Sequence, residues 1–108
     1  MDTKFKAPKE MARLLGGFAT ERRVRILKAL MAAGDEGLSI LELTRATDTT
    51  VADIGMSLES LASLNMINIS IINNERVLVS NRAVLNSIFG EFYKHYVVGR
   101  GDLSASKN

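Results

Sequence analysis

The chain has 108 residues, of which 46% are hydrophobic and 24% are charged, and it carries a formal net charge of +2. This length suits one domain with a modest core, and the composition is that of a globular protein. It contains no cysteine, which excludes disulfides, thiolate metal ligands and thiol redox switches. No apolar run approaches the length of a bilayer span and no hydrophobic signal region is present, so we expect a cytoplasmic protein without a membrane partner.

The N-terminal part of the chain predicts a short arm followed by two helices. Residues 1–7 are polar and basic and are expected to be a flexible arm. Pro8 suits the first turn of a helix, and a second helix is expected over the basic stretch that follows. We expect residues 8–98 to form the folded domain and the polar tail at 99–108 to be disordered. The apolar stripe of the first helix consists of Met11, Leu14, Leu15 and Phe18.

The centre of the chain, residues 39–80, predicts two helices that are joined by a tight turn and followed by a β-hairpin. Ser39 with Glu42, and Thr50 with Asp53, have the spacing of a capping box, which satisfies the free amides at the start of a helix. Behind the second cap, apolar residues recur at helical spacing, which predicts an inward face. That face consists of Val51, Ile54, Leu58 and Leu61.

The hairpin follows the second of these helices. Asn65 can take the left-handed conformation that ends a helix. The pair Asn73-Asn74 tolerates the positive φ values of a two-residue turn between strands. The first strand alternates isoleucines with polar residues, the period of a half-buried strand, and its isoleucines are Ile67, Ile69 and Ile71. Helix, turn, helix and hairpin together predict a winged helix-turn-helix.

From about Met11 to Val98 the chain resembles the arsenic-repressor (ArsR-type) transcriptional regulators. The segment ATERRVRILKAL is similar to their second helix, SILELTRAT to their third, and TVADIGMSLESLASLNMI to their recognition helix with its exit into the wing. The resemblance is a pattern of apolar and capping residues that covers most of the chain. It implies a mainly α winged helix-turn-helix fold with five helices and a small β-hairpin wing. It also implies a homodimeric, sequence-specific DNA-binding transcriptional regulator that acts as a repressor on operator DNA.

The first and last helices carry more large apolar side chains than a small monomer needs. The last helix holds four of the six aromatic residues. A flat, exposed aromatic face would be an association surface, and the resemblance implies a dimer built through these two helices. The alternative is that this face covers the core of the monomer. The expected interface residues are Met11, Leu14, Leu15, Phe18, Leu85, Ile88, Phe89, Phe92 and Tyr96.

The charge is unevenly distributed along the chain. Residues 1–30 have a net charge of +5 and residues 76–108 a net charge of +3, whereas residues 31–75 carry seven acids against Arg45 alone. DNA affinity comes largely from Lys and Arg that neutralise phosphates, and here the segment expected to enter the groove is the acidic one. Phosphate contacts are therefore expected from Arg45 and Arg76. A basic cluster on the second helix could add to them if it lies near the duplex, or could be only the solvated face of that helix; it consists of Arg22, Arg23, Arg25 and Lys28. Arg22 and Arg23 could equally pair with the acids of the centre, including across a dimer.

Exposed residues at the start of the recognition helix are expected to contact bases. Thr and Ser can bond several base edges, Ala can contact a thymine methyl group, and Asp can accept from cytosine. Asp53 therefore has two interpretations, a contact to cytosine or closure of the cap with Thr50. Gly55 indicates either close approach to DNA or a partner, or close packing on a neighbouring helix. The expected DNA-binding residues are Arg45, Thr49, Thr50, Ala52, Asp53, Met56, Ser57, Asn73, Asn74 and Arg76.

Metal sensing and catalysis are not expected. The third helix offers no soft ligand, and the last helix offers His95 with Glu91 one turn before it, which cannot complete a tetrahedral zinc site unless two subunits share them. There is no cysteine nucleophile, no glycine-rich phosphate loop after a strand and no close carboxylate pair set in an apolar site, so we expect no enzyme, no cofactor and no metal. An unidentified small-molecule or protein effector stays open. The alternative function is a protein-interaction module whose acidic helix-turn-helix binds a basic partner instead of DNA.

Overall fold

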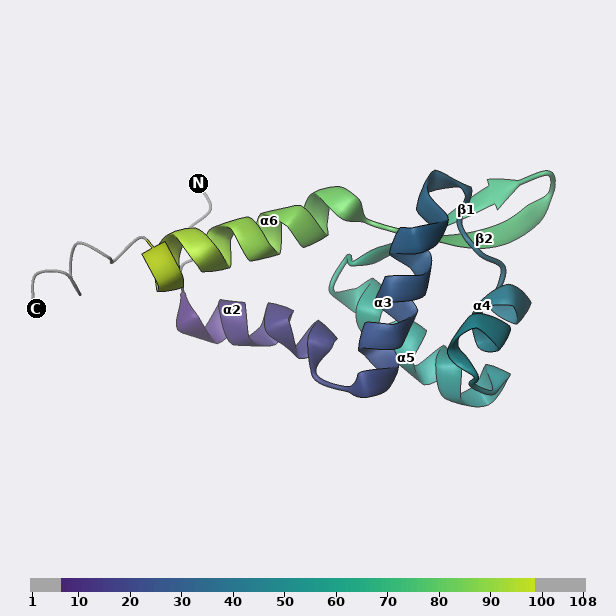
Figure 1. Cartoon of the computed structure of the whole chain (residues 1–108), viewed down its shortest axis with the longest axis horizontal. Helices are drawn as coiled ribbons and strands as arrows, with labels where there is room; N and C mark the ends of the chain where they lie inside the picture. Colours follow the sequence, from purple (N-terminus) through teal and green to yellow (C-terminus); the bar gives the residue numbers. More distant parts are fainter. Residues whose placement is uncertain (1–6, 99–108) are drawn as a thin grey trace, which may run out of the picture. The chain divides into compact units, whose positions relative to one another are not determined.

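The computed structural model describes residues 7–98 and divides them into two compact units (Figure 1). We call Gly17–Arg82 the helix-turn-helix unit, and residues 7–16 with 83–98 the terminal-helix unit. The predicted arm and tail lie outside the described residues, apart from Ala7. The described residues form the helices α2 (Pro8–Leu15), α3 (Glu21–Ala33), α4 (Ile40–Thr47), α5 (Val51–Ser63) and α6 (Arg82–Phe92), and the strands β1 (Ile67–Ile72) and β2 (Glu75–Ser80).

Two caps start the helices of the helix-turn-helix. The Ser39 hydroxyl accepts from the Glu42 amide at 3.1 Å and the Glu42 carboxylate accepts from the Ser39 amide at 2.9 Å, so the predicted capping box of α4 is confirmed. The Thr50 hydroxyl accepts from the Asp53 amide at 3.1 Å and caps α5. The Asp53 carboxylate does not return a bond to Thr50, so the second predicted box is only half formed.

The core of the helix-turn-helix unit lies around α3, which packs against α4, α5 and β2. Val51, predicted to face this core, is instead 58% exposed, because it is the first residue of α5 and faces a surface groove beside the hairpin. The other three residues of the predicted inward face of α5 are buried, as expected. The fully buried side chains of the unit are Ile26, Leu30, Leu43, Ile54, Leu61 and Met66.

The strands β1 and β2 form an antiparallel hairpin whose register pairs Ile69 with Leu78 and Ile71 with Arg76. Its turn residues have φ values of 54° and 65°, which confirms the predicted two-asparagine turn. In β1 only Ile67 is buried, so the prediction of a half-buried strand fails for Ile69 and Ile71, which are 58% and 68% exposed. In β2, Val77, Leu78 and Ser80 are buried. The hairpin extends beyond the helices and forms a wing (Figure 1).

Gly37 holds the loop before α4 against the base of the wing. The adjacent Leu38 exchanges two backbone hydrogen bonds with Leu78, at 3.0 and 2.7 Å. Gly37 has a φ of 68°, and a Cβ at this position would lie 2.5 Å from the Leu78 carbonyl oxygen. Glycine is therefore required here both by conformation and by close approach.

The terminal-helix unit contains α2 and all of α6 except Arg82. Of the residues expected at a dimer interface, Met11, Leu14, Leu85 and Ile88 are buried within the chain. Phe89 is half-exposed, and so are several aromatic and aliphatic side chains of the π-helical turn Tyr93–Val98 that follows α6. None of the helices in residues 7–98 has the length and apolarity needed to cross a membrane.

Candidate nucleic-acid interface

The turn between α4 and α5 is fixed by its own hydrogen bonds. Asp48 takes a left-handed conformation with a φ of 55°, which ends α4. The Thr49 amide donates to the Thr44 carbonyl at 3.0 Å, and the Thr49 hydroxyl donates to the Thr47 carbonyl at 3.0 Å. These bonds hold the N-terminus of α5, with its free backbone amides, in a defined position.

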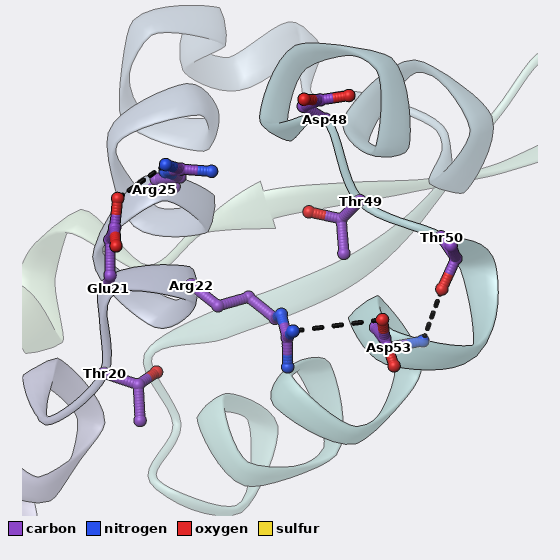
Figure 2. Close-up of a pocket in the computed structure, with 8 residues that line it drawn as sticks. All are labelled: Thr20, Glu21, Arg22, Arg25, Asp48, Thr49, Thr50 and Asp53. Carbon is purple, nitrogen blue, oxygen red and sulfur yellow. Dashed lines mark hydrogen bonds and ion pairs between the residues drawn. The ribbon is translucent and has the colours of Figure 1, made fainter.

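A polar cleft of about 400 Å³ opens between the start of α3 and this turn (Figure 2). We call it the α3–α5 cleft. From α3 it is lined by Arg22 and Arg25, and from the other side by the hydroxyl residues Thr49 and Thr50. Thr20, the N-cap of α3, also lines it, so the capped ends of both helices meet at this cleft.

Both arginines of the cleft are held by acids of the same unit. Arg25 pairs with Glu21 at 2.5 Å and donates to the Thr47 carbonyl at 3.5 Å. Arg22 lies 3.9 Å from the Asp53 carboxylate, and the two side chains are 46% and 53% exposed. A pair so long and so exposed contributes little to stability. Arg22 can therefore exchange Asp53 for another anion at small cost.

The four residues of the basic cluster on α3 lie in different surroundings. Arg23 points to α5, where it donates to the Ser60 hydroxyl at 3.2 Å. Lys28 lines a separate hollow further along α3. Of these four residues only Arg22 and Arg25 reach the cleft. The pairing of Arg22 with Asp53 agrees with the alternative that it meets an acid of the centre, and Arg25 pairs with Glu21 one turn before it on the same helix. The signal in the sequence was a run of four basic residues without an indication of which faced the turn.

A second depression, about 650 Å³ in volume, lies between α5 and the hairpin. We call it the wing groove. Its α5 wall includes Val51 and Met56, and its hairpin wall includes Ile69 and Arg76. Glu59 of α5 also lines it. The groove is therefore mainly apolar, with one cation and one anion at its border.

Most of the predicted DNA-binding residues are at the surface of the helix-turn-helix unit. Ser57 is the exception: it is 6% exposed, and the prediction that it is exposed is wrong. Ser57 lies three residues after Ile54 and next to Leu58, which places it at the edge of the buried stripe. Thr49 is partly buried. The exposed members are Arg45, Thr50, Ala52, Asp53, Met56, Asn73, Asn74 and Arg76.

Two further observations concern Gly55 and the two cations that were expected to contact phosphates. A Cβ built on Gly55 would meet no atom within 4 Å, so close packing on a neighbouring helix does not explain this glycine. Arg45 and Arg76 form no ion pair with any residue in the range 7–98, so both cations are available to a partner.

The described residues contain no group of three metal-ligating side chains. His95 Nε2 lies 2.8 Å from a carboxylate oxygen of Glu91, but without the geometry of a hydrogen bond. Glu91 lies in the last turn of α6 and His95 in the π-helical turn that follows, so the two residues are one turn apart, as their spacing predicts. It supplies two ligands from one chain, which is fewer than a zinc site needs.

No sequence-family model matches the chain, and no curated protein matches it. Two solved structures share its fold over most of its length. NolR from Sinorhizobium fredii is 21% identical, with a TM-score of 0.57, and the match covers 83% of this chain and 93% of NolR. A MepR–DNA complex from S. aureus contains a chain that is 16% identical, with a TM-score of 0.58, and the match covers 92% of this chain and 86% of MepR.

These likenesses and the element order establish the class of fold. The chain is a mainly helical winged helix-turn-helix with five α-helices in its described residues and a two-stranded wing, as the sequence predicted. At such identities the likeness shows the fold alone. The narrower resemblance to ArsR-type regulators remains a prediction.

Proposed function

We propose that this chain is a homodimeric, sequence-specific DNA-binding transcriptional regulator that acts as a repressor. The observation that carries the proposal is the α3–α5 cleft, where Arg22 and Arg25 lie beside the N-terminus of α5. Arginines and the amides of a helix N-terminus are the groups that bind DNA phosphates. The lining also holds the acids Glu21, Asp48 and Asp53, so the two arginines offset most of the negative charge at this turn without giving the cleft a positive excess. The MepR likeness supports the same use of the fold.

In this proposal the N-terminal turns of α5 enter the major groove, and cations on both sides contact the backbone. Arg45 on α4 and Arg76 on the wing are exposed and supply two such contacts. The hydroxyl of Thr50 and the amides of Asn73 and Asn74 add neutral donors, which also bind phosphate oxygens. Two copies of α5 related by a twofold axis would contact half-sites about one helical turn apart, so the operator is nearly palindromic.

The homodimer is proposed to form through the terminal-helix unit. Four of the predicted interface residues are buried within the chain and support the fold of α2 and α6. The contact itself therefore falls to the residues that stay at the surface. They include Phe89, which is 52% exposed, and Tyr96, which stacks on Phe92 with ring centroids 5.3 Å apart. Exposed aromatic rings are typical of association surfaces.

The proposal is tested by titrating the full-length chain into the DNA upstream of its own gene at two salt concentrations. We expect a mobility shift that weakens strongly as salt rises, and weaker binding for Arg45→Ala and for Arg76→Ala. Lys28→Ala is the matched control, because it removes the same charge from a residue that lines neither the cleft nor the wing groove. Unchanged affinity for both arginine variants would contradict the proposed placement on DNA.

A second function has a specific observation in its favour. The outer face of α5 carries the acids Asp53 and Glu59 beside the exposed apolar side chains of Val51 and Met56. Such a surface also suits a basic protein partner. This protein-interaction module would show no DNA binding at physiological salt. Its partner would be lost on Asp53→Lys or Glu59→Lys, whereas DNA binding by a regulator would improve with either charge reversal.

A further inference from the structure

The outer face of α5 has an unusual composition for a helix proposed to contact bases. Specific base contacts are made most often by Arg, Lys, Asn and Gln, which bond guanine or adenine through two atoms. The sequence of α5, Val51–Ser63, contains none of these four residue types. Apart from Asp53, the exposed side chains of its first turns are small or apolar, and Val51 and Met56 are 58% and 71% exposed.

These apolar positions form one continuous face. Val51, Ala52, Gly55 and Met56 follow the i, i+1, i+4, i+5 spacing of neighbours on a helix surface. All four line the wing groove. Gly55 lies in the middle of the face, and the space where its Cβ would lie is empty within 4 Å. The helix backbone is therefore open to close approach along this line, with a larger apolar side chain on each side.

The acids near this face do not change its character. Asp53 lies on the side of α5 that borders the α3–α5 cleft, where its carboxylate faces Arg22 at 3.9 Å. Glu59 lies two turns into the helix, beyond the segment that a groove admits most deeply. The first two turns of α5 therefore offer DNA an apolar surface that is bordered by Arg76 of the wing.

The major groove of DNA has one apolar feature, the 5-methyl group of thymine. We infer that α5 selects its operator by contacts to thymine methyl groups, made by Val51, Ala52 and Met56, and that the bases facing this helix are thymine-rich. This inference rests on the proposed DNA-binding function and specifies what the same helix recognises. The arginines of the cleft and the wing would supply affinity without sequence preference, and the apolar face would supply the selection.

In the first experiment, the full-length chain is used to select bound duplexes from a random-sequence library. The duplex that binds best is then synthesised again with deoxyuridine in place of thymine, and the two affinities are compared. This exchange removes only methyl groups. We expect affinity to fall about three- to fivefold for each contacted thymine, the effect of exposing a methyl-sized apolar group. 5-Bromodeoxyuridine should restore affinity, because bromine has nearly the size of the methyl group.

The second experiment couples the protein to the methyl groups. The Met56→Ala variant should bind the thymine duplex more weakly than wild type does. On the deoxyuridine duplex the variant and wild type should have about the same affinity. Met31→Ala is the matched control, because this methionine on α3 is also exposed and does not line the wing groove. Met56 is 71% exposed, so its truncation leaves the core intact.

The outcomes separate the two proposals. Salt-dependent binding that is equally strong with thymine and deoxyuridine would overturn the methyl inference and leave the DNA-binding function in place. Failure of wild type to bind or enrich any duplex at low salt would overturn the DNA-binding function itself, and the inference with it.

Discussion

The α3–α5 cleft and the wing groove both border the N-terminal half of α5, but their chemistry is opposite. The cleft is lined by hydroxyls, by two arginine–carboxylate pairs and by Asp48, whereas the groove is mainly apolar with Arg76 and Glu59 at its border. The difference shows how a helix from an acidic segment can still face a polyanion. On one side, arginines of α3 offset much of the negative charge. On the other side, the first two turns present apolar side chains for contacts that depend on shape, with Glu59 further along the helix.

The largest effect is expected from removing the cations of the cleft. Arg22→Ala combined with Arg25→Ala should weaken DNA binding about 50-fold per half-site at 0.1 M salt. It should also reduce the slope of log affinity against log salt concentration by about two per half-site, because each phosphate contact contributes about one unit to that slope. The measurement is a fluorescence-anisotropy titration over a range of salt concentrations. Lys28→Ala, on the same helix, should reproduce neither change. An unchanged slope in the double variant would show that the cleft does not contact phosphate.

The next effect concerns the attachment of the wing, which forms one wall of the groove. Gly37→Ala should lower the free energy of unfolding by about 2 kcal/mol, because a side chain at a positive φ is strained and its Cβ would meet the Leu78 carbonyl. Chemical denaturation measures this loss. Gly16→Ala is the control, because a Cβ there meets nothing within 4 Å and its φ of −58° is unstrained. Equal stability of the two variants would contradict the close approach at Gly37.

Local sequence signals predicted the elements of the fold well. The caps at Ser39 and Thr50, the left-handed Asn65 and the two-asparagine turn all act within a few residues, and each is present in the structure. Exposure along the wing was harder to predict. Ile69 and Ile71 have the alternation of a buried strand, but whether a strand face is covered depends on how far the helices reach, which no local pattern records.

The candidate site was predicted only in part, for the same reason. Residues of the turn and the wing tip could be named because their place in the helix-turn-helix follows from the order of elements, and their contacts with DNA stay a prediction. The contribution of Arg22 and Arg25 depends on a tertiary contact between α3 and the turn, so the sequence could not distinguish them from a solvated basic face. Ser57 was misplaced because one helical position separates the outer face of α5 from its buried stripe.

A smaller effect is expected from removing an N-cap, and it should differ between Thr50, which lines the cleft, and Ser39, which does not. Thr50→Ala should cost about 1 kcal/mol of stability, the usual loss for an N-cap, and should also weaken DNA binding because this hydroxyl borders the cleft. Ser39→Ala removes the cap of α4 and should cost a similar free energy with little change in DNA affinity. Thermal unfolding and DNA titration of both variants give the comparison. Equal losses of DNA affinity would place Thr50 outside the interface.

The smallest effect concerns Asp53, the acid shared between the helix and the cleft. Asp53→Asn should strengthen DNA binding about two- to threefold, because it removes a negative charge near the phosphates and releases Arg22. Glu36→Gln is a control for the loss of one exposed acid, because Glu36 lines neither the cleft nor the wing groove. If Asp53 instead accepts a bond from cytosine, the Asn variant would bind its selected duplex more weakly than wild type does.

Placement of the first turns of α5 in the major groove is tested most directly by amide hydrogen exchange of the full-length chain with and without its selected duplex. The first amides of a helix have no acceptor within it and exchange readily in the free chain. We predict that DNA slows exchange most strongly at residues 49–56, with a second protected segment at 73–76 of the wing. A duplex that binds the chain and leaves exchange at residues 49–56 unchanged would contradict this placement.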